Sequence, residues 1–139
     1  MSDSFSPALA AVHCVCFLLL RDGHVLLERR RQDKAVDPGL IMVPGGHVEE
    51  GESHLQTLQR EVREELGIEP VAAAYVCSLL HPTTELQVLH YYRVSDWTGE
   101  PVAHEAEELI WFPLDRLAEL NLSPDDVAVR EALRLYGPA

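Results

Sequence analysis

Basic residues are scarce in this chain: 11 lysines and arginines stand against 23 aspartates and glutamates, a formal net charge of −12. Proteins that bind nucleic-acid polymers depend on Lys and Arg contacts to phosphate, so this acidity predicts no such polymer as a partner. An acidic protein can still bind a small phosphorylated molecule if divalent cations lie between its carboxylates and the phosphates. The composition therefore leaves small-molecule substrates open.

Long apolar segments are also absent. The longest uncharged stretch, residues 5–20, is interrupted by His13, and no basic segment precedes it. We therefore expect neither a transmembrane helix nor a signal peptide, no membrane partner, and by default a cytoplasmic location.

Cysteine is limited to Cys14, Cys16 and Cys77. The number is odd, and the first two alternate along a strand-like segment, which places them on one face. We expect buried reduced thiols, because a metal site would need further Cys or His residues at ligand spacing.

A single domain is expected over residues 1–139, since the length suits one core and no repeat, linker or low-complexity segment interrupts it. An Asp-Gly turn predicts a hairpin of strands 12–20 and 24–28, and Pro-Gly-Gly at 44–46 should end regular structure. The other expected elements are loops over 29–40 and 97–101, strands over 41–43, 71–80, 86–95 and 109–112, and a last helix from Ser123-Pro124 to before Gly137.

A helix is predicted over residues 54–66. The Ser53 hydroxyl can cap its start, Gln56 can complete a capping box, and Gly67 can end it in the left-handed conformation. Apolar side chains recur on it at three- and four-residue spacing and should pack on a sheet. They are Leu55, Leu58, Val62 and Leu66.

Glu61, Glu64 and Glu65 gather on an adjoining face of this helix, because positions i, i+3 and i+4 are neighbours. Three like charges repel unless arginines or a bound cation compensate them, and Arg60 and Arg63 offer only partial compensation. Hard cations such as Mg²⁺ prefer oxygen ligands that are shared with substrate phosphates. Taken alone, these residues equally allow a solvated, salt-bridged helix face.

The wider context favours the cation. From Gly46 to Ile68 the chain follows the pattern G-x5-E-x7-R-E-V-x-E-E-x-G-I, which resembles the Nudix box at every defining position. Ordinary residue frequencies give a chance match on the order of 10⁻¹⁰ per starting point. The resemblance implies a Nudix α/β/α sandwich with a central mixed sheet and a catalytic loop-helix-loop, hence a metal-dependent hydrolase of phosphoric anhydrides.

By this resemblance Glu61, Glu64 and Glu65 hold Mg²⁺ or Mn²⁺, with the backbone carbonyl of Gly45 as a further ligand. Arg60 and Glu52 would orient these carboxylates as an ion pair. They are the residues of the box to which the resemblance assigns roles around the metal.

Beyond the box, Trp97-x-Gly99-Glu100-Pro101 and Glu105 resemble the MutT-type branch of the family. The match carries Glu105 onto a distant metal-binding carboxylate, with Glu107 or Glu108 as alternatives if the loop is registered differently. Either Glu61 or Glu105 would then be the general base.

The run Arg29-Arg30-Arg31 resembles a phosphate-contacting basic site, and strand alternation favours Arg30, although a solvated basic cluster is the other interpretation. His47 replaces a lysine of that branch, so its phosphate contact would be weaker or pH-dependent. Asp126 takes the position of a base-reading Asn and could prefer purines, or could only favour a helix N-terminus.

The leading function is hydrolysis of a nucleoside triphosphate, including oxidised purine forms, to a monophosphate and pyrophosphate. Dinucleoside polyphosphates or ADP-sugars are the alternative substrates, and a catalytically silent nucleotide-binding module is the remote one. A small-molecule nucleotide is thus the expected partner, and the sequence makes no prediction about oligomeric state.

Overall fold

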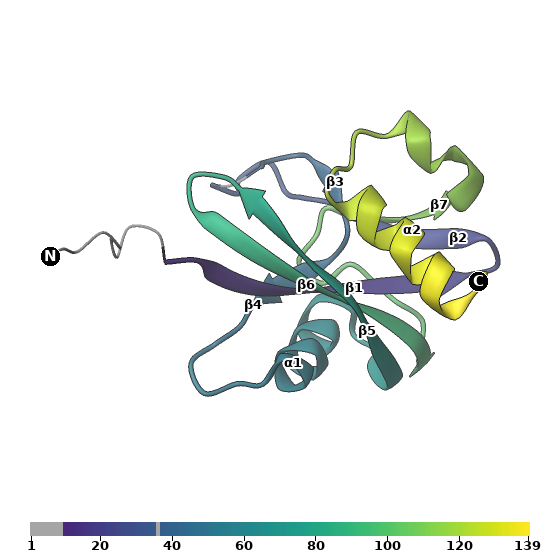
Figure 1. The fold of residues 1–139 in the computed structure, drawn as a ribbon, viewed down its shortest axis with the longest axis horizontal. Coiled ribbons are helices and arrows are strands. Elements are labelled where there is room, and N and C mark those ends of the chain that lie inside the picture. The colour runs from purple at the N-terminus through teal and green to yellow at the C-terminus, as the bar shows by residue number, and fades with distance from the viewer. Residues whose placement is uncertain (1–9, 36) are drawn as a thin grey trace, which may run out of the picture.

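The computed structural model describes residues 10–35 and 37–139, which form a seven-stranded sheet between two helices (Figure 1). Five strands follow the order β3-β2-β1-β6-β5, while β4 pairs with β1 and β7 pairs with β2. The β1–β6 pair is parallel and the other pairs are antiparallel, so the sheet is mixed, as predicted. The elements are β1 Val12–Arg21, β2 His24–Arg29, β3 Ile41–Met42, β4 Gly45–His47, α1 His54–Leu66, β5 Glu69–Pro82, β6 Leu86–Thr98, β7 Glu108–Pro113, the 3-10 helix η2 Leu114–Glu119 and α2 Asp125–Tyr136.

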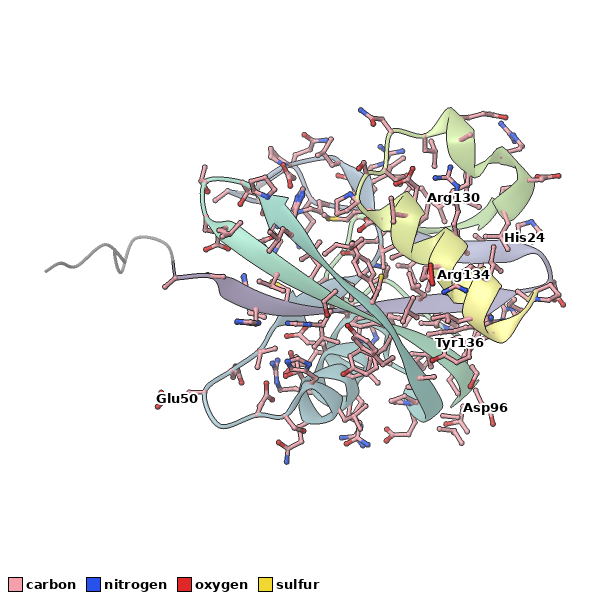
Figure 2. All side chains as sticks on the ribbon, viewed as in Figure 1. His24, Glu50, Asp96, Arg130, Arg134 and Tyr136 are labelled. Atoms are coloured by element: carbon pink, nitrogen blue, oxygen red, sulfur yellow. The ribbon has the colours of Figure 1, made fainter. Side chains whose placement is uncertain are left out.

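The central strand β1 contributes to a core on each face of the sheet, because successive side chains of a strand point in opposite directions. Phe17 packs in the core that contains Val62 of α1. Its neighbour Leu18 packs in the core that contains Val129 of α2. One helix therefore covers each face, and charged side chains such as Glu50, Asp96 and Arg130 point outward (Figure 2).

Helix α1 has the predicted bounds and caps. Ser53 Oγ accepts from the Gln56 amide, Gln56 Oε1 accepts from the Ser53 amide, and Gly67 closes the helix at φ 66°. The apolar stripe was placed wrongly at one end, since Leu55 is 53% exposed. The buried face is shifted toward the carboxylates and includes Glu61 and Glu65 instead.

Other expectations differ from the structure where pairing partners extend the sheet. Pro44-Gly45-Gly46 was expected to end regular structure, but Gly45 and Gly46 belong to β4 because they pair with β1. Trp97 was expected in a loop and instead lies in β6, which pairs with β5 as far as Thr98. Helix α2 begins at Asp125, with Pro124 as its N-cap, and η2 was not predicted. Within the described residues, neither α1 nor α2 is long and apolar enough to span a membrane.

Candidate active site

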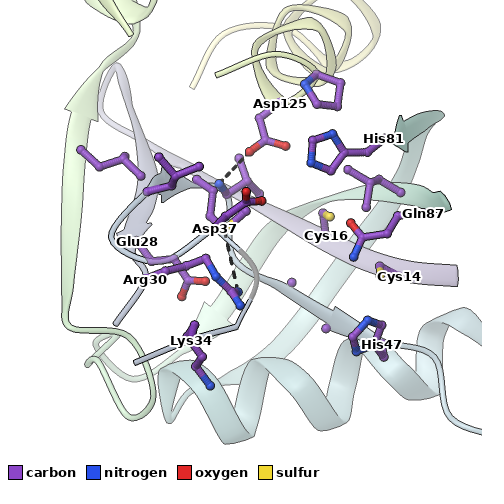
Figure 3. Close-up of a pocket in the computed structure, with 18 of the residues that line it drawn as sticks. Cys14, Cys16, Glu28, Arg30, Lys34, Asp37, His47, His81, Gln87 and Asp125 are labelled. Atoms are coloured by element: carbon purple, nitrogen blue, oxygen red, sulfur yellow. Dashed lines mark hydrogen bonds between the residues drawn. The ribbon is translucent and has the colours of Figure 1, made fainter. Parts of the chain in front are cut away.

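A cavity of about 570 Å³ lies between α1 and the start of α2 (Figure 3). Its walls come from segments that are far apart in the sequence. Arg30 and Lys34 lie on one side, His81 and Gln87 on the other, and Asp125 at the end remote from α1. This cavity brings together most of the residues that the sequence singled out.

Four of the carboxylates that line the cavity repel one another: Glu28 of β2, Glu61 and Glu65 of α1, and Glu105 of the loop before β7. Burial, together with repulsion by Glu28, Glu61 and Glu105, raises the pKa of Glu65 to about 10. Burial likewise raises the pKa of Glu28 to about 7 and that of Glu61 above its ordinary value. The cluster is therefore electrostatically strained when all of its members are charged.

One oxygen in this cluster has no partner. Glu65 Oε2 is buried and makes no hydrogen bond within the described part of the chain. Hard divalent cations take such carboxylate oxygens as ligands, so the donor set suits Mg²⁺ or Mn²⁺. No three His, Cys, Asp or Glu side chains in residues 10–35 and 37–139 are already at ligand geometry, so an ion would have to draw the carboxylates together.

The two glycines of β4 let the backbone approach these carboxylates. A Cβ on Gly46 would lie 2.2 Å from the carboxyl carbon of Glu61. A Cβ on Gly45 would lie 2.7 Å from the carbonyl oxygen of Val15 on β1. A side chain at Gly45 would collide with backbone, whereas one at Gly46 would displace the Glu61 carboxylate, and both glycines line the cavity.

Arg60 holds a second group of carboxylates together. Its guanidinium donates to Glu52 at 2.7 and 2.9 Å, to Glu61 at 2.6 Å and to Glu64 at 3.3 Å, and also to the carbonyl of His47 at 3.0 Å. Hydrogen bonds from Arg60 lower the pKa of Glu52 to about 2. The predicted ion pair is thus present, whereas Glu64 is half exposed and lies beside the cavity rather than in its wall.

The structure also separates the neighbouring candidates outside the box. Arg30 lines the cavity, whereas Arg29 pairs with Glu108 at 2.8 Å and Arg31 pairs with Asp33 at 3.0 Å. Glu105 lines the cavity too. Glu107 and Glu108 are not part of its lining, which leaves Glu105 as the candidate ligand.

His47 and two cysteines complete the wall beside β4. His47 lies 3.4 Å from Glu85 of the β5–β6 turn and is largely exposed. Cys14 and Cys16 are buried free thiols that face the cavity, as the alternation along β1 predicted. Burial raises the pKa of Cys14 to about 11, so it is a poor nucleophile at neutral pH.

Asp126, the residue to which the resemblance assigned base reading, lies outside the cavity, whereas its neighbour Asp125 lines it. Asp126 pairs with Arg130 at 3.1 Å, accepts from the Val127 amide at 2.9 Å and is not part of the cavity lining. Asp125 lines the cavity, accepts from the Val43 amide at 3.0 Å and accepts from the hydroxyl of Tyr91. The α2 N-terminus turns the first of the two aspartates inward.

Two functional candidates were missed by sequence reasoning. Glu28 is the only charge in the apolar strand segment Val25–Glu28, a pattern that marks a buried polar residue. Asp125 carried no comparable signal, because its orientation depends on where α2 begins.

Comparison with known proteins agrees with this geometry. The NUDIX domain family matches residues 10–134. The chain is 37% identical to the CTP pyrophosphohydrolase of Escherichia coli over 92% of its length and 97% of that protein. It is 38% identical to an 8-oxo-dGTP diphosphatase of Haemophilus influenzae over 64% of its length and 65% of that protein.

A solved structure has the same fold. The solution structure of the E. coli ORF135 protein superposes with a TM-score of 0.79 at 33% identity, covering 98% of this chain and 99% of that one. Together with the family match, this likeness means that the chain belongs to the Nudix family of enzymes that hydrolyse phosphoric anhydride bonds.

Proposed function

We propose that the enzyme hydrolyses nucleoside triphosphates to a monophosphate and pyrophosphate. The observation that carries this proposal is a single cavity with carboxylates at one end and the buried acceptor Asp125 at the other. Such a cavity suits a ligand with an anionic tail and a hydrogen-bonding base. The names of the two relatives, which concern nucleoside triphosphates, support the same substrate class.

The anionic tail would bind through Mg²⁺ or Mn²⁺ held by Glu61, Glu65, Glu105 and the Gly45 carbonyl, with Glu64 completing the set from the cavity edge. When bound, the metal neutralises the phosphates and acidifies a water. Arg60 holds the Glu61 carboxylate against Gly46, which fixes the position of a ligand oxygen before substrate arrives.

Two further roles belong to the chain's own side chains. Arg30 lines the same cavity and supplies a cation to the phosphates, and His47 adds a weaker, pH-dependent donor. Either Glu61 or Glu105 accepts the proton of the attacking water. Both are cavity-lining carboxylates, so both meet the first geometric requirement of a general base.

The end of the cavity lined by Asp125 favours a nucleotide base that carries an exocyclic amine. Both carboxylate oxygens of Asp125 already accept a hydrogen bond, one from Tyr91 and one from Val43, and this fixes the group in an orientation to accept another. An ionised carboxylate only accepts hydrogen bonds, so it favours an exocyclic amine over a carbonyl oxygen at the same position of the base. Cytosine, adenine and guanine present an exocyclic amine, whereas uracil and thymine do not. This contrast replaces the purine preference that was expected from Asp126.

Product analysis with Mg²⁺ tests the proposal. Nucleoside triphosphates, 8-oxo-dGTP, a dinucleoside polyphosphate and an ADP-sugar are incubated separately, and products are separated by chromatography. We expect monophosphate and pyrophosphate, with kcat/KM for CTP and GTP about 10- to 100-fold above that for UTP, the usual worth of a hydrogen bond to a charged group. Faster turnover of the dinucleoside polyphosphate or ADP-sugar would contradict the proposal.

Paired variants test the base contact. Asp125→Asn should narrow the CTP to UTP ratio, because the amide has only one acceptor oxygen. Asp126→Asn is the matched control and should leave the ratio unchanged, since Asp126 lies outside the cavity lining. If Asp125→Asn melts like the wild type and its ratio of kcat/KM for CTP to that for UTP is unchanged, Asp125 does not contact the base.

A further inference from the structure

Three histidines from different elements meet outside the cavity: His13 of β1, His54 at the first position of α1 and His90 of β6. His13 Nδ1 lies 2.9 Å from His90 Nε2. The two ring centroids are 5.2 Å apart with only 4° between the planes, so the rings lie nearly in one plane and meet edge to edge. The ring of His54 lies 4.2 Å from that of His90 and is tilted by 32°.

A hydrogen-bonded chain continues from His90 into β5. His90 Nδ1 lies 2.6 Å from Ser78 Oγ, which lies 2.7 Å from the hydroxyl of Tyr75. A neutral imidazole donates at one nitrogen and accepts at the other. All hydrogen bonds from Tyr75 to His13 can therefore form when both imidazoles are neutral, with the donors running in either direction along the series.

The geometry limits how many protons this cluster can take up. If His90 alone is protonated, it can still donate to His13 and to Ser78. If His13 is protonated as well, two N–H groups face each other across 2.9 Å and the hydrogen bond is lost. A charge on His54 adds repulsion at 4.2 Å and also lies at the positive end of the α1 dipole.

The surroundings offset three positive charges only in part. Glu49, Glu50 and Glu52 line a hollow beside His13 and His54, but Arg60 already pairs with Glu49 and Glu52. The hydroxyls of Tyr75 and Tyr92 also face the cluster, through Ser78 and His54 respectively. Burial and the two neighbouring histidines lower the pKa of His90, in the direction that the contacts predict.

We propose that His13, His54 and His90 form a proton-sensitive latch that fastens the start of α1 to the sheet. Because the hydrogen bond between His13 and His90 needs one of the two facing nitrogens to be unprotonated, this stability is full above the ordinary histidine pKa of about 6.5 and is lost as pH falls below it. The latch acts on the helix that carries Glu61 and Glu65, through residues that do not line the cavity.

His13→Gln tests the latch, because the glutamine oxygen can accept from His90 but cannot take up a proton. Melting temperatures of wild type and variant are measured from pH 8 to pH 5 under one metal condition. We expect the wild type to lose several degrees more than His13→Gln below pH 6.5. His24→Gln, in the β1–β2 hairpin (Figure 2), should follow the wild type.

Imidazole NMR titration of the full chain provides the second measurement. His13, His54 and His90 should titrate as a coupled group, with at least one of them protonated only well below pH 6. Parallel melting curves for wild type and His13→Gln, or three independent titrations near the ordinary histidine pKa, would overturn the proposal. His54→Gln gives the same test from the helix side if His13→Gln does not fold.

Discussion

Two groups of carboxylates meet at α1, one around Arg60 and one inside the cavity, and they differ in how their negative charge is compensated. Around Arg60, the protein supplies its own cation, and the pKa of Glu52 falls to about 2. Inside the cavity, burial and mutual repulsion raise the pKa of Glu65 to about 10, and one of its oxygens has no partner. Glu61 belongs to both groups. The difference supports the proposal that the first group positions side chains, whereas the second needs a bound cation to be fully charged.

Of the changes considered, metal removal should have the largest effect on activity, because the cavity carboxylates then lose their compensating cation. Excess EDTA is expected to abolish hydrolysis, and added Mg²⁺ should raise the melting temperature by relieving carboxylate repulsion. The metal-free stability should fall as pH rises from the unfolded value of about 4.5 through about 7, because Glu28 and Glu65 have raised pKa values when folded. Full activity in EDTA, or a metal effect that shrinks with rising pH, would contradict the assignment.

Glu65→Gln should reduce kcat by about 100-fold or more, as expected when one preorganised charge is lost. Its metal-free melting temperature at neutral pH should rise, since the raised pKa of folded Glu65, which opposes folding above pH 4.5, is removed. Glu64→Gln should also lose activity but gain no stability, because Glu64 is half exposed and paired with Arg60. Near-wild-type turnover of either variant in saturating Mg²⁺ would show that the glutamate concerned does not serve the metal.

Arg60→Gln should have a smaller effect on activity, about 10- to 100-fold, which is typical when a residue that orients ligands is lost. It should also lower the melting temperature, because Glu52, Glu61 and Glu64 lose their shared cation. Arg63→Gln is the matched control, since Arg63 pairs with the exposed Glu69, which does not line the cavity. If Arg60→Gln and Arg63→Gln changed kcat and stability equally, the carboxylates around Arg60 would have no positioning role.

Sequence reasoning succeeded where the signal was local. The capping residues and the box spacing fixed α1 from His54 to Leu66, and strand alternation separated Arg30 from its two neighbours. It failed where long-range pairing decides the outcome, as for β4, whose residues pair with β1. Asp125 was missed for the same reason, because its inward orientation depends on contacts with Val43 and Tyr91, far away in the chain.

The origin of the cavity walls has a consequence for how such enzymes diverge. Half of the carboxylate end, Glu61 and Glu65, comes from the continuous box, where a side chain on Gly46 would displace the Glu61 carboxylate. The base end comes from residues of β5, β6 and the start of α2, such as His81, Gln87 and Asp125. On the proposed assignment, substitutions in these segments would change the accepted nucleotide and leave the metal-binding carboxylates unchanged. After gene duplication, selection can therefore produce new specificities while the chemistry is inherited unchanged.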